Sequence, residues 1–205
     1  MRKALTIGEL LITMTIIGVI AILVIPGFLK DYHHKVYTTK LKKAYGLLSN
    51  AMEQACIDNN VSYFNQTPYS KGGATDKQQE FLDNYFKVSK KNAGSAFADT
   101  YRTIAGVNNE GTAITDHLNG TAKSKLQGGE AIALLCETTV DECVVMIDIN
   151  GKDGPNIGGR DLFRFRLDTK KNIVMSHSDV NECGTDQYGH GCLNRLLKDN
   201  WIMKY

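Results

Sequence analysis

The sequence predicts an α+β protein in which a long N-terminal helix packs on a C-terminal antiparallel β-meander. Three observations lead to this prediction. An apolar run covers residues 5–29, a helical apolar stripe continues to about residue 58, and short alternating runs separated by turn residues follow residue 130. A helix with one apolar stripe needs a partner surface, and a sheet with one apolar face provides it.

The composition indicates one ordinary domain beside the apolar run. The chain has 205 residues, of which about 175 lie beyond residue 29, and that length is enough for one core. The 24 basic and 22 acidic residues give a net charge of +2, so composition does not favour a nucleic-acid partner. Four of the five cysteines form two short-spaced pairs.

The run at residues 5–29 is long enough to cross a bilayer as a helix. It is too long for the apolar core of a secretory signal peptide, and no small-residue cleavage site follows it. An uncleaved signal anchor is the simplest interpretation. Glu9 is the only ionisable residue inside the run, and a carboxylate in lipid is costly enough to mark a functional site.

Two signals disagree about the side of the membrane on which the domain lies. Arg2 and Lys3 precede the run, but more lysines follow it, and the positive-inside tendency then places the domain in the cytoplasm. The cysteine pairs instead indicate an oxidising compartment. Charge alone therefore does not settle the orientation.

Residues 30–58 are expected to continue the helix as its soluble half, so that the rod reaches roughly 80 Å. Its apolar stripe consists of Tyr37, Leu41, Ala44, Leu48, Ala51 and Ala55. Residues 59–130 are expected to form a variable connecting region, with an amphipathic helix at 75–90 and polar loop at 94–129. Residues 131–205 are expected to form the antiparallel sheet and its tail, with strands at 131–136, 144–149, 162–167 and 172–176.

Residues 3–12 read Lys-Ala-Leu-Thr-Ile-Gly-Glu-Leu-Leu-Ile and resemble the N-terminal signal of type IV pilins and type II secretion pseudopilins. The usual threonine, glutamate, glycine and proline of that family correspond to Thr6, Glu9, Gly18 and Pro26. The family usually has glycine before the cleavage site and phenylalanine after it, where this chain has Ala4 and Leu5. Both substitutions preserve small size or hydrophobicity.

The resemblance implies a structural, non-enzymatic subunit that needs no cofactor. Residues 1–4 would be a leader, removed between Ala4 and Leu5 by a prepilin peptidase that also methylates the amino group of Leu5. Subunits would then polymerise with themselves or with other pilins through residues 5–58, with help from an ATPase and a platform protein. The implied location is the bacterial cytoplasmic membrane, single-pass with the N-terminus inside, and later a periplasmic or extracellular filament.

The same resemblance assigns roles within the run. Glu9 would pair with the freed amino group of a neighbouring subunit and set the axial register. Without the motif, Glu9 is simply a carboxylate at a helix N-terminus, where the helix dipole favours it. Gly18 and Pro26 would loosen the helix during assembly, although membrane helices also tolerate an ordinary proline.

The C-terminal half also resembles a broad group of prepilin-like proteins. The shared features are a DxNGxxGPNxxGxDxFxF element at residues 148–165 and a tail containing Cys183, Gly191, Cys192, Trp201 and Tyr205. The loop gathers oxygen-bearing side chains that suit calcium, namely Asp148, Asn150, Asp153, Asn156 and Asp161. Their spacing differs from that of an EF-hand, and metal-free hairpin loops rich in Asp and Asn are commoner.

The cysteines suggest two disulfides, one between Cys183 and Cys192 and one between Cys136 and Cys143. Cys56 is left unpaired or buried. A zinc site made of Cys183, His190, Cys192 and His177 is an alternative whose spacing matches no strong zinc pattern.

The sequence has none of the common catalytic motifs, such as GxSxG, HExxH or a P-loop. The alternatives to a filament subunit are an uncleaved, signal-anchored extracytoplasmic binding domain and a minor pilin that binds DNA or a surface ligand. The DNA interpretation depends on three cations near the tail, Arg195, Lys198 and Lys204. Such residues are more often a solvated face.

Overall fold

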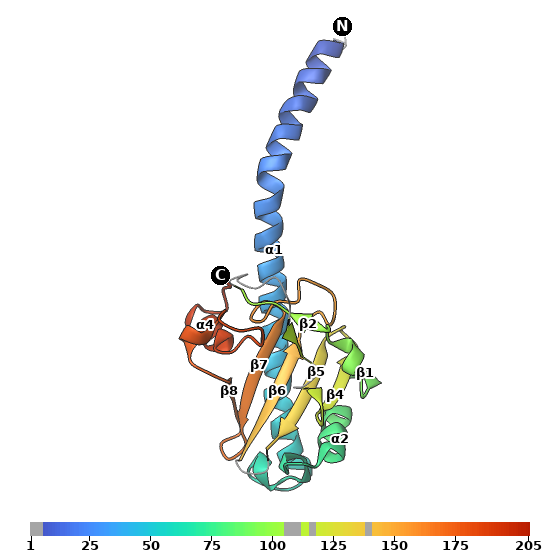
Figure 1. Cartoon of the computed structure of the whole chain (residues 1–205), viewed down its shortest axis with the longest axis vertical. Helices are drawn as coiled ribbons and strands as arrows, with labels where there is room; N and C mark the ends of the chain where they lie inside the picture. Colours follow the sequence, from blue (N-terminus) through green and yellow to red (C-terminus); the bar gives the residue numbers. More distant parts are fainter. Residues whose placement is uncertain (1–5, 105–111, 115–117, 138–140) are drawn as a thin grey trace. The chain divides into compact units, whose positions relative to one another are not determined.

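The computed structural model describes residues 6–104, 112–114, 118–137 and 141–205. The chain forms two compact units, which we call the arm (Met1–Val36) and the head (Tyr37–Tyr205). Helix α1 (Ile7–Asp58) begins in the arm and ends in the head. The head combines this helix with an antiparallel sheet, so the α+β layout expected from the sequence is confirmed (Figure 1).

The remaining elements all lie in the head. The α-helices are α2 (Thr75–Tyr85) and α4 (Cys192–Lys198). The short 3₁₀ helices are η1 (Phe64–Gln66), η2 (Pro68–Ser70), η3 (Gly94–Ala96) and η4 (Val180–Glu182). The strands are β1 (Val88–Lys91), β2 (Thr100–Tyr101), β3 (Thr112–Ala113), β4 (Ala122–Leu126), β5 (Ala131–Cys136), β6 (Glu142–Asp148), β7 (Leu162–Asp168) and β8 (Ile173–Ser176).

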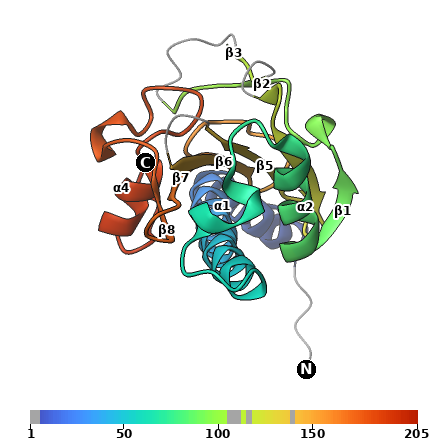
Figure 2. The same cartoon turned by 90° about the horizontal axis from the view of Figure 1, so that it is seen from below.

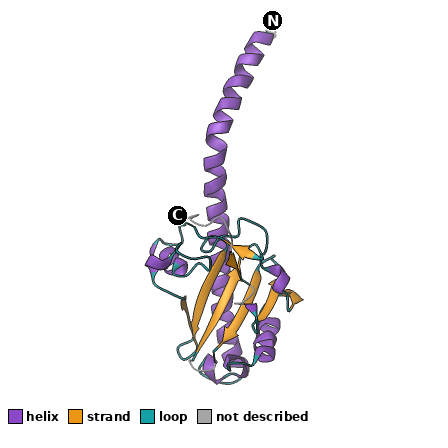
Figure 3. Ribbon diagram, viewed as in Figure 1, coloured by secondary structure: helices purple, strands orange, loops and turns teal. Residues whose placement is uncertain are grey.

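Six strands form one sheet in the order β1-β4-β5-β6-β7-β8, and each neighbouring pair is antiparallel (Figure 3). Strands β5 to β8 follow one another directly along the chain, which is the meander predicted from the alternating runs. Strands β2 and β3 pair separately as a two-stranded ribbon.

The sheet also includes two strands from the region that the sequence predicted to be a connecting segment. The expected helix at residues 75–90 ends at Tyr85 as α2, and Val88 then begins β1. The expected loop at 94–129 contains β4. Strand β4 was not predicted from the sequence, because its buried positions include the small residues Ala122 and Ser124, which alternate with lysines and give only a weak hydrophobic pattern.

The second part of α1 covers one face of the sheet, as Figure 2 shows. Leu41, Leu48 and Met52 of α1 are fully buried, and so are Phe163 and Phe165 of β7 in the same cluster. The predicted helical stripe is therefore the core-facing surface of α1, with Tyr37 partly buried at its start. We call this cluster the inner core.

The opposite face of the sheet carries a second, smaller apolar cluster, which we call the outer core. Tyr101 of β2 and the loop residues Phe97 and Ile114 pack there with Ala131 and Met146 of the sheet. Figure 2 shows β2 and β3 on the side of the sheet away from α1. Covering both faces explains why nearly every residue of β6 is buried instead of every second one.

Candidate functional site

The arm presents an apolar surface that nothing in the described chain covers. Between Ile7 and Leu29 the large apolar side chains are from 46% exposed at Leu10 to 81% exposed at Ile7. Among the described residues, α1 is the one helix long and apolar enough to cross a membrane. A continuous apolar surface of this size requires lipid or protein around it.

Glu9 takes part in a capping box at the start of α1. The Glu9 carboxylate (Oε2) accepts hydrogen bonds from the Thr6 backbone N–H and from the Thr6 hydroxyl, each at 2.9 Å. In return, the Glu9 backbone N–H donates to the Thr6 hydroxyl oxygen (Oγ1) at 3.2 Å. This reciprocal pair satisfies two amides that a helix otherwise leaves unpaired at its N-terminus.

The capping box could have been found in the sequence, because Thr6-Ile7-Gly8-Glu9 has the threonine and glutamate spacing that defines it. It gives Glu9 a role within its own subunit in addition to the inter-subunit role implied by the pilin resemblance. Ala4 and Leu5, the predicted cleavage and methylation site, lie outside the described residues.

The other two hydroxyl side chains of the arm's apolar stretch are satisfied by their own helix. The hydroxyl of Thr13 donates to the Leu10 carbonyl at 2.9 Å, and that of Thr15 donates to the Leu11 carbonyl at 2.8 Å. Internal satisfaction of this kind is what a helix needs where no water is available.

Gly18 and Pro26 both lie inside α1, which continues on either side of them. A Cβ atom added at Gly18 would meet nothing within 4 Å. Packing within this chain therefore does not require glycine at that position. Pro26 lacks an N–H, so the carbonyl four residues earlier loses its usual helical partner. The loosening of the helix at Gly18 and Pro26 during assembly stays a prediction.

Both predicted disulfides are present in the head, Cys136–Cys143 and Cys183–Cys192. Cys136 and Cys143 are directly opposite each other on β5 and β6. Cys183 follows η4 and Cys192 begins α4, so their bond closes the loop before that helix. Cys56 is a buried free thiol, and burial raises its pKa.

The zinc alternative is not supported, because Cys183 and Cys192 are bonded to each other. Within the described residues, no group of three or more His, Cys, Asp or Glu side chains is arranged to hold a metal ion. His177 and His190 stack on each other with ring centroids 4.6 Å apart.

The two buried carboxylates of the predicted calcium loop are engaged in hydrogen bonds. Asp161 accepts from the backbone N–H groups of Asn156 and Ile157 at 2.6 Å each, and from its neighbour Leu162 at 3.1 Å. Asp148 accepts from the Tyr101 hydroxyl and, at 3.1 Å, from the Asn150 N–H. Burial raises the pKa of Asp148 to about 8 and raises that of Asp161 as well.

The asparagines of this loop also bind the loop itself. The Asn150 amide donates to the carbonyls of Asp153 and Gly154, and the Asn156 amide donates to the carbonyl of Lys152. Of the five predicted calcium ligands, Asn150 and Asn156 are the two with a side-chain oxygen that is buried without a partner in the described chain. Asp148 and Asp161 thus have a structural role, because their hydrogen bonds hold the loop closed. Calcium binding stays a prediction.

Two of the three tail cations have partners within the tail. The Arg195 guanidinium lies 4.6 Å from the centre of the Tyr205 ring, and Lys204 forms an ion pair with Asp199 at 3.0 Å. These contacts are typical of a folded tail and give no additional support to a DNA-binding face.

Comparison of the chain with known protein families, with curated proteins and with solved structures gave no match.

Proposed function

We propose that this protein is a prepilin-like structural subunit that assembles into a type IV pilus or a type II secretion pseudopilus. One observation carries the proposal. The arm exposes apolar side chains all along residues 7–29, and the single carboxylate of that stretch, Glu9, lies at the start of the helix within the pilin-like motif. The α+β head is the kind of domain that such a motif precedes.

The physical reason for assembly is the uncovered surface of the arm. In the membrane, lipid covers it, and α1 residues 7–29 at 1.5 Å per residue span about 35 Å, enough for a hydrocarbon core of about 30 Å. In a filament, the arms of neighbouring subunits cover it instead. A glycine at position 18 that is free of contacts in its own chain leaves room for such a neighbour.

The proposed processing and assembly of the subunit require three partners. A prepilin peptidase cuts between Ala4 and Leu5 and methylates Leu5, and a platform protein and an ATPase drive polymerisation. The subunit first crosses the bacterial cytoplasmic membrane once, with its N-terminus inside, and later lies in a periplasmic or extracellular filament. The two disulfides of the head favour this orientation, because such bonds persist in oxidising compartments.

The N-terminal peptide of membrane-extracted protein tests the proposal. Mass spectrometry should find a chain that starts at Leu5 and carries one added methyl group. The same chain produced in a host without prepilin peptidase should keep Met1 and serves as the control. An intact Met1 in the host with active peptidase would contradict the proposal and would make the arm a plain anchor for an extracytoplasmic domain.

A further inference from the structure

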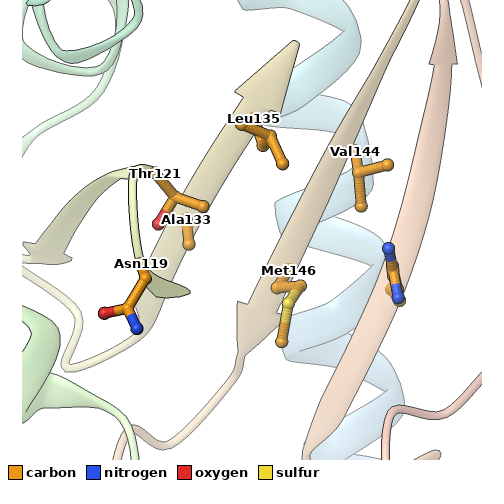
Figure 4. Close-up of a pocket in the computed structure, with 7 residues that line it drawn as sticks. Asn119, Thr121, Ala133, Leu135, Val144 and Met146 are labelled. Atoms are coloured by element: carbon orange, nitrogen blue, oxygen red, sulfur yellow. The ribbon is translucent and has the colours of Figure 1, made fainter. Parts of the chain in front are cut away.

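The outer face of the sheet contains a cavity of about 130 Å³ beside the outer core. Its floor is apolar, and Figure 4 shows Ala133 and Leu135 on one strand beside Val144 and Met146 on the next. These four side chains share a face because Ala133 is opposite Met146 and Leu135 is opposite Val144 in the β5–β6 pairing. The floor therefore suits a small hydrocarbon group.

One wall of the cavity is Arg164, which is opposite Met146 on the neighbouring strand β7. The Arg164 Nε is buried and has no hydrogen-bond partner in the described chain. Nor does Arg164 form an ion pair with any carboxylate in the described ranges, although Arg166 on the same strand pairs with Glu142 at 3.4 Å. A partly buried guanidinium that no carboxylate contacts directly is unfavourable. Burial lowers the Arg164 pKa, and the more distant charges of Tyr188, Asp186 and Glu137 act against this shift.

A contact with a ring nitrogen of a histidine holds Arg164 in position. Its Nη1 lies 3.2 Å from His190 Nε2, while His190 Nδ1 lies 2.8 Å from the Asp186 carboxylate (Oδ2). When His190 Nδ1–H donates to Asp186, Nε2 is left to accept from Arg164. Asp186 and His190 belong to the loop that the Cys183–Cys192 disulfide closes.

From this arrangement we propose that the cavity binds a small monocarboxylate, with the carboxylate on Arg164 and its hydrocarbon part on the four apolar floor residues. A guanidinium offers a carboxylate two parallel N–H donors, which fixes orientation as well as charge. A cavity of about 150 Å³ holds a benzene ring, so the hydrocarbon part has roughly four to six carbon atoms. This site is independent of whether the chain is cleaved or polymerised.

Titration of the full chain in a nonionic detergent tests the proposal, with benzoate and isovalerate as probes. Met146 lies in the cavity floor, so its ¹³C-labelled methyl group should show a saturable NMR shift with either acid. The methyl group of Met52, which is buried in the inner core, should not move. Benzamide has nearly the shape of benzoate without its charge, and it should bind at least about tenfold more weakly.

Three variants test whether benzoate binds in this cavity. Arg164→Met should weaken benzoate binding by about tenfold or more, because it keeps much of the side-chain volume and removes the charge. Arg166→Met is the matched control, and it should change benzoate binding by less than about twofold because Arg166 does not line the cavity. Ala133→Leu should abolish binding by filling the floor while leaving Arg164 in place.

Several results would overturn the proposal. These are no saturable Met146 shift at millimolar acid, equal binding of benzamide and benzoate, and unchanged binding by Arg164→Met. If Arg164→Met does not fold, undiminished binding by Ala133→Leu decides against the site. Binding that required an acidic side chain of a partner protein, with no response to either free acid, would also overturn it.

Discussion

The hydroxyl group of Tyr101 donates a hydrogen bond to the carboxylate of Asp148, and both side chains are buried. Tyr101 belongs to the β2–β3 ribbon and Asp148 ends β6, so this bond ties the ribbon to the end of the central strand. The Ala98 N–H also donates to the Tyr101 oxygen, at 3.0 Å. The bond therefore anchors the covering of the outer core to the sheet.

The contribution of Asp148 to the stability of the head should fall as pH rises from about 4 to about 8. Burial raises the pKa of Asp148 from 3.8 to about 8, so over this interval the folded state holds a proton that the unfolded chain has released. Linkage then lowers the free energy of unfolding by at most about 1.4 kcal/mol per pH unit. The stabilising contribution is complete below pH 4 and is lost as the pH passes 8.

Asp148→Asn tests this prediction, because an amide keeps an acceptor for Tyr101 and does not titrate. Urea unfolding of the full chain in detergent should show a smaller loss of stability between pH 5 and pH 8 in the variant than in the native chain. Equal slopes in the two proteins would mean that Asp148 does not govern this pH dependence.

Removal of the Cys183–Cys192 disulfide should destabilise the head by about 2–3 kcal/mol, since the bond closes a short loop in the unfolded chain. The double variant Cys183→Ser/Cys192→Ser, measured by urea unfolding, gives this value. Hydrogen exchange should also become faster in residues 183–191. Non-reducing peptide mapping of the native protein provides the control, and free thiols at both positions in exported protein would refute the pairing.

Leu48→Ala should cost about 2–5 kcal/mol of stability, because Leu48 is fully buried in the inner core. Leu47→Ala is the matched control at the preceding position of the same helix. Leu47 is 41% exposed, so its truncation should cost less than about 1 kcal/mol. Similar losses for both variants, measured by urea unfolding, would show that α1 does not pack on the sheet through the predicted stripe.

Much of this fold follows from local pattern. Strand β5 has the bounds 131–136 predicted from its apolar run, and the α1 stripe was recognisable from spacings of three and four residues. Such segments can be recognised from the sequence because one face of each is buried. The apolar residues on that face recur with the period of the helix or strand. Strand β4 gives no comparable signal, since lysines flank the small residues that it buries, and its place depends on pairing with β5.

Some features of the candidate sites could also be predicted from local sequence, and others could not. The disulfide pairs could be predicted from their short spacing, and the capping box of Thr6 and Glu9 is readable from four residues. The cavity beside Arg164 could not be predicted, because three strands line it together with Asn119 and Thr121. His190, which contacts Arg164, lies 26 residues farther along the chain. Register and loop placement decide such a site, and neither is a property of local sequence.

Glu9 has two candidate roles that three variants of the arm can separate. The capping role needs a side-chain oxygen that accepts from Thr6, and glutamine at this position of a capping box also provides one. The inter-subunit role needs a negative charge to pair with an amino group. Glu9→Gln therefore keeps the cap and removes the charge, Thr6→Ala weakens the cap and keeps the charge, and Glu9→Ala removes both.

If charge sets the register between subunits, Glu9→Gln and Glu9→Ala should be processed but poorly incorporated into filaments, whereas Thr6→Ala should be incorporated nearly as well as the native chain. The measurement is the ratio of subunit in sheared filaments to subunit in the membrane, with the N-terminal peptide checked by mass spectrometry in each strain. Normal incorporation of Glu9→Gln together with poor incorporation of Thr6→Ala would assign Glu9 to helix capping alone. Normal incorporation of Glu9→Ala would remove both roles from assembly, because neither the carboxylate nor its hydrogen bonds to Thr6 would then be needed.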